Sequence, residues 1–146
     1  MSDPSKTDRT GLRSVPAMTP RLDAIGLVVS DLATSLAFYR RLGVDVPDEV
    51  EGPHAEAGLG GGLRLMFDTE DVARSLDPSW TRATGGHPFA LAVACGSPDE
   101  VDALHAALVG DGAPSGLDPF DAPWGQRYAQ VEDPDGNAVD LYAPLG

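Results

Sequence analysis

The stretch AIGLVVSDLATSLAFYRRLGV at residues 24–44 contains two different hydrophobic periods. Over residues 22–29 the larger apolar side chains alternate, with Ile25, Leu27 and Val29 on one face, which predicts a strand. Asp31 then caps a helix, because its carboxylate can accept a hydrogen bond from the first turn. The helix has an apolar stripe made by Leu32, Leu36, Tyr39 and Leu42, and Gly43 ends it. A strand followed by a helix on one core is therefore expected.

The same order of elements returns in the second half of the chain. Residues 89–93 alternate in the same way, and a further helix begins after Ser97, with Pro98 at its first position and Glu100 completing a capping box. This second helix runs to Gly110. Short strands are predicted at residues 44–50, 54–59 and 63–67 in the first half, and at 113–117, 126–131 and 138–142 in the second. The turn DPDGN at residues 133–137 separates the last two strands as a hairpin.

The sequence thus predicts an α+β domain over residues 21–146. It consists of one βαβββ module at residues 21–68, a linker at 69–86 with a short helix at 70–76, and a second module at 87–146. Each module is too small to fold well alone, so the other half or a partner chain must cover its second sheet face. Residues 1–20 lack periodicity, which predicts a disordered N-terminal tail.

The composition excludes several classes of partner. Lys and Arg total 10 against 23 Asp and Glu, a formal charge of −13, which argues against binding to nucleic acid or to anionic membranes. The single cysteine, Cys95, excludes an internal disulfide and is interpreted as a small buried side chain. No apolar run is long enough to span a membrane, and residues 1–20 lack the apolar centre of a signal peptide. A cytoplasmic location is expected.

The segments AIGLVVSDLATSLAFYRRLGV and YAQVEDPDGNAVDLYAP resemble the two ends of a vicinal oxygen chelate protein. That superfamily includes glyoxalases, extradiol dioxygenases and bleomycin-resistance proteins, and the resemblance covers nearly all of residues 21–146. It implies a curved mixed sheet with helices outside. The run APWGQRY at 122–128, together with GVDVP, PHAEA, GGLRL, TGGH and LYAPL, is most similar to mitomycin-binding resistance proteins. Such proteins sequester a drug unaltered, commonly as dimers with clefts between the chains.

The resemblance also implies where a metal would bind. Metal-dependent members carry His, Gln or Glu at four positions, which correspond here to Ala24, Arg64, Pro88 and Asp140. Only Asp140 has a suitable donor, and one carboxylate does not hold a divalent ion against water, so no cofactor is expected. The alternative is a metal-dependent lyase, isomerase or dioxygenase in which His87 turns inward beside Asp140. Arg64 and Asp140 themselves are interpreted as an acid–base pair or as a salt bridge across the sheet.

Aromatic side chains are the expected ligand contacts. Trp124 precedes a predicted strand, a position that the resemblance places at the mouth of the cleft, where an indole can stack on a planar ring; otherwise it packs on its own loop or anchors a dimer. The resemblance to mitomycin-binding proteins also implies that His54 is its partner in an aromatic sandwich, with a neutral imidazole; otherwise His54 is a solvated side chain. An apolar wall and polar contacts complete the predicted ligand-binding set: Phe120, Tyr142, Arg64, Asp68, Gln126, Tyr128 and Asp140. Three further residues are assigned structural places, Phe67 in the core, Trp80 as a plug and His105 at the surface.

Three functions follow from these residues. The leading hypothesis is a metal-free protein that sequesters a planar or peptidic antibiotic, such as mitomycin or bleomycin, in the cleft of a homodimer that can exchange strands. The second is the metal-dependent enzyme of glyoxalase or dioxygenase type. The third is a module that binds a protein partner through its acidic face. The absence of a catalytic Ser-His-Asp, Cys-His or phosphate-loop pattern favours binding over turnover.

Overall fold

A computed structural model describes residues 20–146 and confirms the predicted α+β architecture. The predicted tail lies outside the described residues apart from Pro20. The first module begins with β1 (Ala24–Val29), α1 (Leu32–Arg41), β2 (His54–Gly60) and β3 (Leu63–Thr69). These strands form one sheet in the order β1-β3-β2, in which β1 runs parallel and β2 antiparallel to β3. The short helix α2 (Glu70–Leu76) follows at the predicted residues and opens the connection to the second module.

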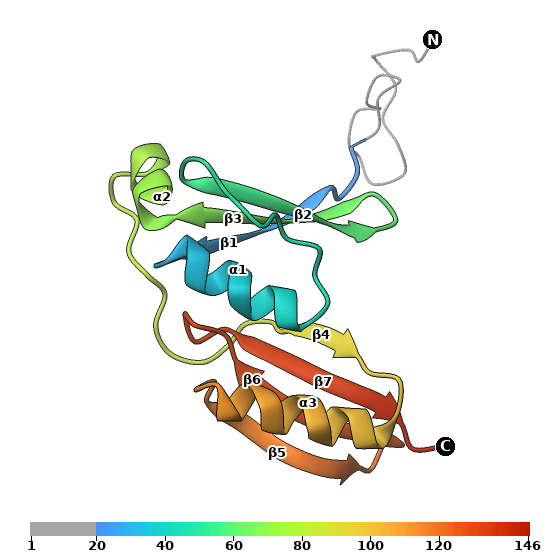
Figure 1. The fold of residues 1–146 in the computed structure, drawn as a ribbon. Coiled ribbons are helices and arrows are strands. Elements are labelled where there is room, and N and C mark those ends of the chain that lie inside the picture. Colours follow the sequence, from blue (N-terminus) through green and yellow to red (C-terminus); the bar gives the residue numbers. More distant parts are fainter. Residues whose placement is uncertain (1–19) are drawn as a thin grey trace, which may run out of the picture.

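The second module has the full βαβββ order. It consists of β4 (Leu91–Ala94), α3 (Pro98–Gly110), β5 (Ser115–Ala122), β6 (Gln126–Glu132) and β7 (Ala138–Pro144). Its sheet has the order β4-β7-β6-β5, with β4 parallel to β7 and the other pairs antiparallel. Figure 1 shows α1 between the first sheet and the second module, while α3 lies along the second sheet. No helix within residues 20–146 has the length and apolarity needed to cross a membrane.

The core joins the two modules. Asp31 caps α1 as predicted, because its side chain accepts a hydrogen bond from the Thr34 amide at 2.9 Å. Tyr39 of α1 packs against Phe67 of β3 with ring centroids 5.4 Å apart, and Phe67 is fully buried, which confirms its place in the core. The same buried cluster continues through Leu141 of β7. Each sheet therefore buries one face and leaves the other open.

The two sequence motifs that suggested the fold contact one another. The Tyr39 hydroxyl of α1 donates a buried hydrogen bond of 2.6 Å to Asp133 in the β6–β7 turn. Asp133 also accepts from the backbone amides of Asp135 and Asn137, both at 2.9 Å, and Asp135 accepts from the Ser30 amide at 3.1 Å. Burial and the charge of Asp133 raise the pKa of Tyr39, so the phenol remains a neutral donor. This contact fixes α1 against the second module.

The predicted strand at residues 44–50 is wrong. This segment follows α1 as irregular chain, with Val46 buried and Arg40 donating to the Pro47 carbonyl at 2.9 Å. Pro47 has no amide hydrogen to donate to a sheet ladder, and no strand of the first sheet pairs with the segment. The first sheet therefore has three strands where four were expected.

Two side chains of the second module also differ from expectation. The strand predicted at residues 89–93 begins later, at Leu91, and Phe89 is 59% exposed. His105, predicted at the surface, is only 7% exposed, and its Nε2 lies 2.8 Å from the Ser115 hydroxyl. The buried stripe of α3 runs through Val101, His105 and Leu108, and Leu104 packs against the same core while only partly buried.

Candidate functional site

The predicted site residues lie on the open faces of two sheets. Because successive side chains of a strand alternate, β3 buries Leu65 and Phe67 while Arg64 and Asp68 point to the opposite side. We call the open side of the first sheet the first face, defined by His54, Glu56, Arg64 and Asp68. We call the open side of the second sheet the second face, defined by Phe120, Trp124, Gln126, Tyr128, Gln130, Asp140 and Tyr142.

The first face carries a chain of ion pairs. His54 Nδ1 lies 2.6 Å from Asp68 Oδ1, and His54 Nε2 lies 2.7 Å from Glu56 Oε2. The guanidinium of Arg64 donates to the other oxygen of Glu56 and, at 2.6 Å, to Asp23 Oδ2. Acidic and basic groups thus alternate across the sheet from Asp68 to Asp23. The face is polar, and in this chain each of the two cationic side chains lies between two carboxylates.

His54 differs in charge from the expected stacking partner. The hydrogen bond to Asp68, followed by that to Glu56, raises the pKa of His54 above its ordinary value of 6.5. With a carboxylate at each ring nitrogen, the ring satisfies both only as an imidazolium, since neutral imidazole has a single N–H donor. These contacts favour the imidazolium over the neutral imidazole that was expected. The two nitrogens are fixed at the ring edge, which leaves the ring plane as the surface for a contact.

The second face carries an aromatic cluster. Trp124, in the turn between β5 and β6, lies edge-on to Tyr128, with centroids 5.5 Å apart and planes at 80°. Phe120 of β5 packs against both rings, at 6.2 Å from Tyr128 and 6.4 Å from Trp124. The indole nitrogen of Trp124 donates to Gln126 at 2.9 Å, yet the residue remains 61% exposed. A large, oriented aromatic surface therefore faces solvent.

Asp140 lies beside this cluster on β7. The Tyr128 hydroxyl donates to its Oδ2, and the Gln130 amide donates to its Oδ1 at 2.8 Å. Burial, and then the hydrogen bond to Asp140, raise the pKa of Tyr128 to about 12, so the phenol remains a neutral donor. Tyr142 occupies the position directly opposite Tyr128 in the β6–β7 pairing. The predicted pairing of Asp140 with Arg64 is wrong, because each has other partners.

Sequence reasoning missed three members of these two groups. Glu56 shares the parity of His54 along β2, and Gln130 shares the parity of Tyr128 along β6, so alternation could have placed both. Asp23 shares the parity of Ile25 and Leu27 in the strand predicted at residues 22–29, so alternation would have placed it on the apolar side, but β1 begins only at Ala24. The hydrogen bonds of Asp23 and Gln130 depend on strand pairing, which the sequence alone did not specify.

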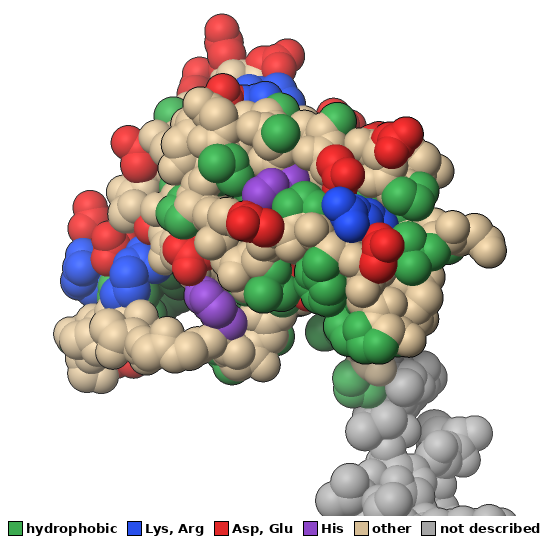
Figure 2. All heavy atoms as spheres, turned by 90° about the horizontal axis from the view of Figure 1, so that it is seen from below, with side chains coloured by type: hydrophobic (Ala, Val, Ile, Leu, Met, Phe, Trp, Pro, Cys, Tyr) green, Lys and Arg blue, Asp and Glu red, His purple; other side chains and the backbone are tan. Residues whose placement is uncertain are grey.

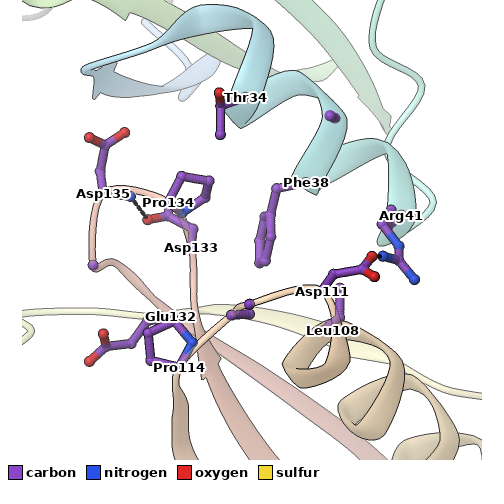
Figure 3. A pocket seen from close by; sticks show the side chains of 14 residues that line it. Thr34, Phe38, Arg41, Leu108, Asp111, Pro114, Glu132, Asp133, Pro134 and Asp135 are labelled. Atoms are coloured by element: carbon purple, nitrogen blue, oxygen red, sulfur yellow. Dashed lines mark hydrogen bonds and ion pairs between the residues drawn. The ribbon is translucent and has the colours of Figure 1, made fainter.

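The two faces remain separate within one chain. No hydrogen bond or ion pair in residues 20–146 joins a first-face side chain to a second-face one, and His54 has no contact of this kind with Trp124. A hollow of about 840 Å³ lies elsewhere, between α1, the end of α3 and the β6–β7 turn, with Phe38 in its wall (Figure 3). Another, of about 550 Å³, lies beside Thr69 and α2. Neither hollow is lined by a predicted site residue.

The residues at the metal positions do not fit a divalent ion. In the strand pairing, Ala24 lies beside Arg64 and Ala92 lies beside Asp140, so the register places Ala92 rather than Pro88 next to the carboxylate. Alanine has no donor atom, and Arg64 is a permanent cation already bound to carboxylates. Across residues 20–146, no three His, Cys, Asp or Glu side chains are arranged to hold a metal.

His87 does not complete this site either. It lies in the connection before β4, where its Nε2 is 3.8 Å from Glu132 Oε1 at the end of β6. Asp140 takes its two hydrogen bonds from Tyr128 and Gln130 instead. The alternative pairing of His87 with Asp140 around a metal is therefore wrong for this structure.

Cys95 belongs to neither the first face nor the second face. Burial raises the pKa of the Cys95 thiol, which makes it a poor nucleophile and agrees with a structural place.

Figure 2 shows acidic side chains distributed over the face seen from below, with basic side chains in only a few places. Trp80, predicted as a structural plug, is partly buried and packs against two guanidiniums, those of Arg74 at 5.4 Å and Arg82 at 5.7 Å.

Comparison with known proteins agrees with this fold and these motifs. The sequence profile of the Glyoxalase/Bleomycin resistance protein/Dioxygenase superfamily matches residues 21–141. The chain therefore belongs to this superfamily, as its two end motifs predicted. Among curated proteins, none matches the chain.

Solved structures show the same architecture. A glyoxalase/bleomycin resistance protein/dioxygenase from Nocardioides is 27% identical, with a TM-score of 0.66 over 90% of this chain and 87% of that one. A family enzyme from Burkholderia phytofirmans is 18% identical, with a TM-score of 0.73 over 86% of this chain and all (100%) of the other. A glyoxalase-related enzyme from Fulvimarina pelagi is 22% identical, with a TM-score of 0.71 over 88% and 94%. These similarities establish the fold, which the superfamily uses both for enzymes and for binding proteins.

Proposed function

We propose that this protein binds and sequesters a planar or peptidic antibiotic of the mitomycin or bleomycin type, without a metal, in a cleft that a second copy completes. The observation that carries the proposal is the exposed aromatic cluster of the second face. Trp124 is 61% exposed although its indole is oriented by Gln126 and by two neighbouring rings. A ring held in place but left open is suited to stacking on a flat ligand, which contributes about 0.5–1.5 kcal/mol beyond burial.

The separation of the two faces supports a dimeric site. Each face is one side of a single sheet, and His54 and Trp124 share no contact within the chain. Placing the first face of one copy over the second face of its partner would bring both rings to one ligand. An isologous dimer would then contain two equivalent clefts, with or without exchange of strands between the chains.

The chemistry of the faces supports binding rather than turnover. Three of the four metal positions carry alanine or an ion-paired arginine, the fourth is the single carboxylate Asp140, and burial raises the pKa of the Cys95 thiol. Sequestration needs affinity and protein abundance, and it requires no nucleophile or general base. The residues present are those that orient a ligand: stacking rings and a few polar groups.

Calorimetric titration of chelator-treated protein with mitomycin C and with metal-free bleomycin tests the proposal. We expect saturable binding of one of the two drugs, and Trp124→Ala should weaken it more than tenfold, about 1.4 kcal/mol, with cooperative unfolding retained. Trp80→Phe is the matched control, since Trp80 lies away from both faces against Arg74 and Arg82. Unchanged affinity in Trp124→Ala would remove Trp124 from the site, and the absence of heat with both drugs would reject the proposed function.

A further inference from the structure

Asp140 differs from the other carboxylates of the open faces in having no cationic partner. On the first face, Glu56 and Asp68 bind His54, and Glu56 also binds Arg64. Asp140 accepts hydrogen bonds only from the neutral side chains of Tyr128 and Gln130. No Arg, Lys or His nitrogen in residues 20–146 lies within ion-pair distance of it. Glu132 lies on the same side of the sheet at the end of β6, but His87 is 3.8 Å from it, so within residues 20–146 Asp140 is the carboxylate of this side that has no basic side chain beside it.

The surface beside Asp140 is open because the side chains next to it are short. Strand β4 forms the edge of the second sheet, and its register places Ala92 beside Asp140 and Ala94 beside Tyr142. Both alanines are exposed, so their short side chains leave room above the sheet next to the carboxylate. Asp140 itself is half-buried and is held at both oxygens. Its position is fixed, and space for a ligand atom is available next to it.

The neighbouring rings favour the same kind of ligand. Tyr128 and Tyr142 lie opposite one another on β6 and β7, and Trp124 packs on Tyr128. The faces of aromatic rings attract cations through their quadrupole, by about 0.5–2 kcal/mol depending on desolvation. Apolar rings around the carboxylate also reduce the local screening of its charge, which increases its attraction for a cation and its repulsion of an anion. Both effects disfavour an anionic ligand.

We infer that Asp140 receives a positively charged nitrogen of the ligand, so that the molecules bound at the second face are planar compounds carrying a basic nitrogen. The inference rests on the proposed function, whose stacking site it extends by one polar contact. The flat body of the ligand stacks at Trp124, and the basic nitrogen lies over β4 against Asp140. The two contacts make separate contributions and can be removed separately.

Three acridines of similar shape and different charge test the inference: proflavine, which is cationic at neutral pH, acridine, which is neutral, and acridine carboxylate, which is anionic. Their dissociation constants are measured by fluorescence with the full-length protein. We expect proflavine to bind at least tenfold more tightly than acridine, and the carboxylate to bind most weakly. Asp140→Asn, which keeps the shape of the side chain, should abolish the preference for proflavine while acridine binding stays within about threefold.

The control is Asp48→Asn, which removes the same charge from a side chain that is 97% exposed in the segment after α1. This variant should keep the full preference for proflavine over acridine. Asp140→Ala should lose that preference to the same extent as Asp140→Asn, and circular dichroism checks that both variants are folded. A preference that survives in both Asp140 variants, or equal binding of proflavine and acridine to the wild type, would overturn the inference and leave stacking intact. Absence of binding by all three acridines would overturn the inference together with the proposed stacking site.

Discussion

At the scale of single residues, the protonation of His54 decides the state of the first face. Its two ring nitrogens face Asp68 and Glu56 at 2.6 and 2.7 Å. Loss of the proton leaves one nitrogen as an acceptor facing an acceptor, so one of the two contacts must break. The lost proton makes the first face more negative by one charge, and one carboxylate loses its contact with the ring.

This coupling predicts how stability depends on pH. The pKa of His54 is raised in the folded state by Asp68 and Glu56, so its contribution to stability is complete below the unfolded value of 6.5 and is lost as the pH rises through the folded value. NMR titration of the His54 ring should give a pKa above 6.5, and Asp68→Asn should lower it. A wild-type ring that titrates at 6.5 or below would contradict the observed geometry.

At the scale of secondary-structure elements, the sequence was sufficient to place the start of a helix where a capping residue and the hydrophobic periodicity indicate the same boundary. Asp31 and Ser97 begin their helices as predicted, because a cap acts within one turn of its own residue. Residues 44–50 have the valines of a strand, but a strand also needs a partner to pair with, and no local pattern reports one. His105 shows a similar limit, since a polar residue on the row facing the sheet is buried when Ser115 supplies a partner.

The contact between α1 and the β6–β7 turn gives a prediction for stability. Tyr39→Phe removes the buried 2.6 Å hydrogen bond to Asp133 while keeping the ring that packs on Phe67. A hydrogen bond to a charged group contributes roughly 1.5–3 kcal/mol, so urea unfolding should show a loss of about that size. Tyr142→Phe is the matched control, because within residues 20–146 the Tyr142 hydroxyl makes no hydrogen bond. Equal losses in the two variants would show that the Asp133 contact contributes nothing specific.

At the scale of the whole molecule, the sequence predicted the superfamily and the exposed tryptophan but not the arrangement of the site. Phe120, Trp124 and Tyr128 do gather on one sheet, as a shared cleft requires. His54 belongs to another sheet and to an ion-pair chain, because strand order and register depend on contacts between distant segments. Pairing of Arg64 with Asp140 failed as a prediction for the same reason.

A dimeric cleft makes a prediction about mixed chains. If the cleft joins the first face of one chain to the second face of its partner, His54→Ala and Trp124→Ala each damage both sites of their own dimers. A heterodimer of the two has one doubly altered cleft and one intact cleft, so equal mixing should restore tight binding in about a quarter of all sites. Calorimetric titration after subunit exchange gives this fraction. Mixing without any restoration would place His54 and Trp124 at the same site within one chain, or His54 at none.

Stacking of a flat drug on Trp124 without a metal can be measured directly by the fluorescence of that residue. The chain has two tryptophans, so Trp80→Phe leaves Trp124 as the single indole whose fluorescence reports on the second face. Chelator-treated Trp80→Phe protein is titrated with mitomycin C and metal-free bleomycin, and its emission is followed. We expect saturable quenching by one of the two drugs, and the removal of metal should not change it. Emission that stays flat with both drugs, or quenching that requires an added metal ion, would contradict this expectation.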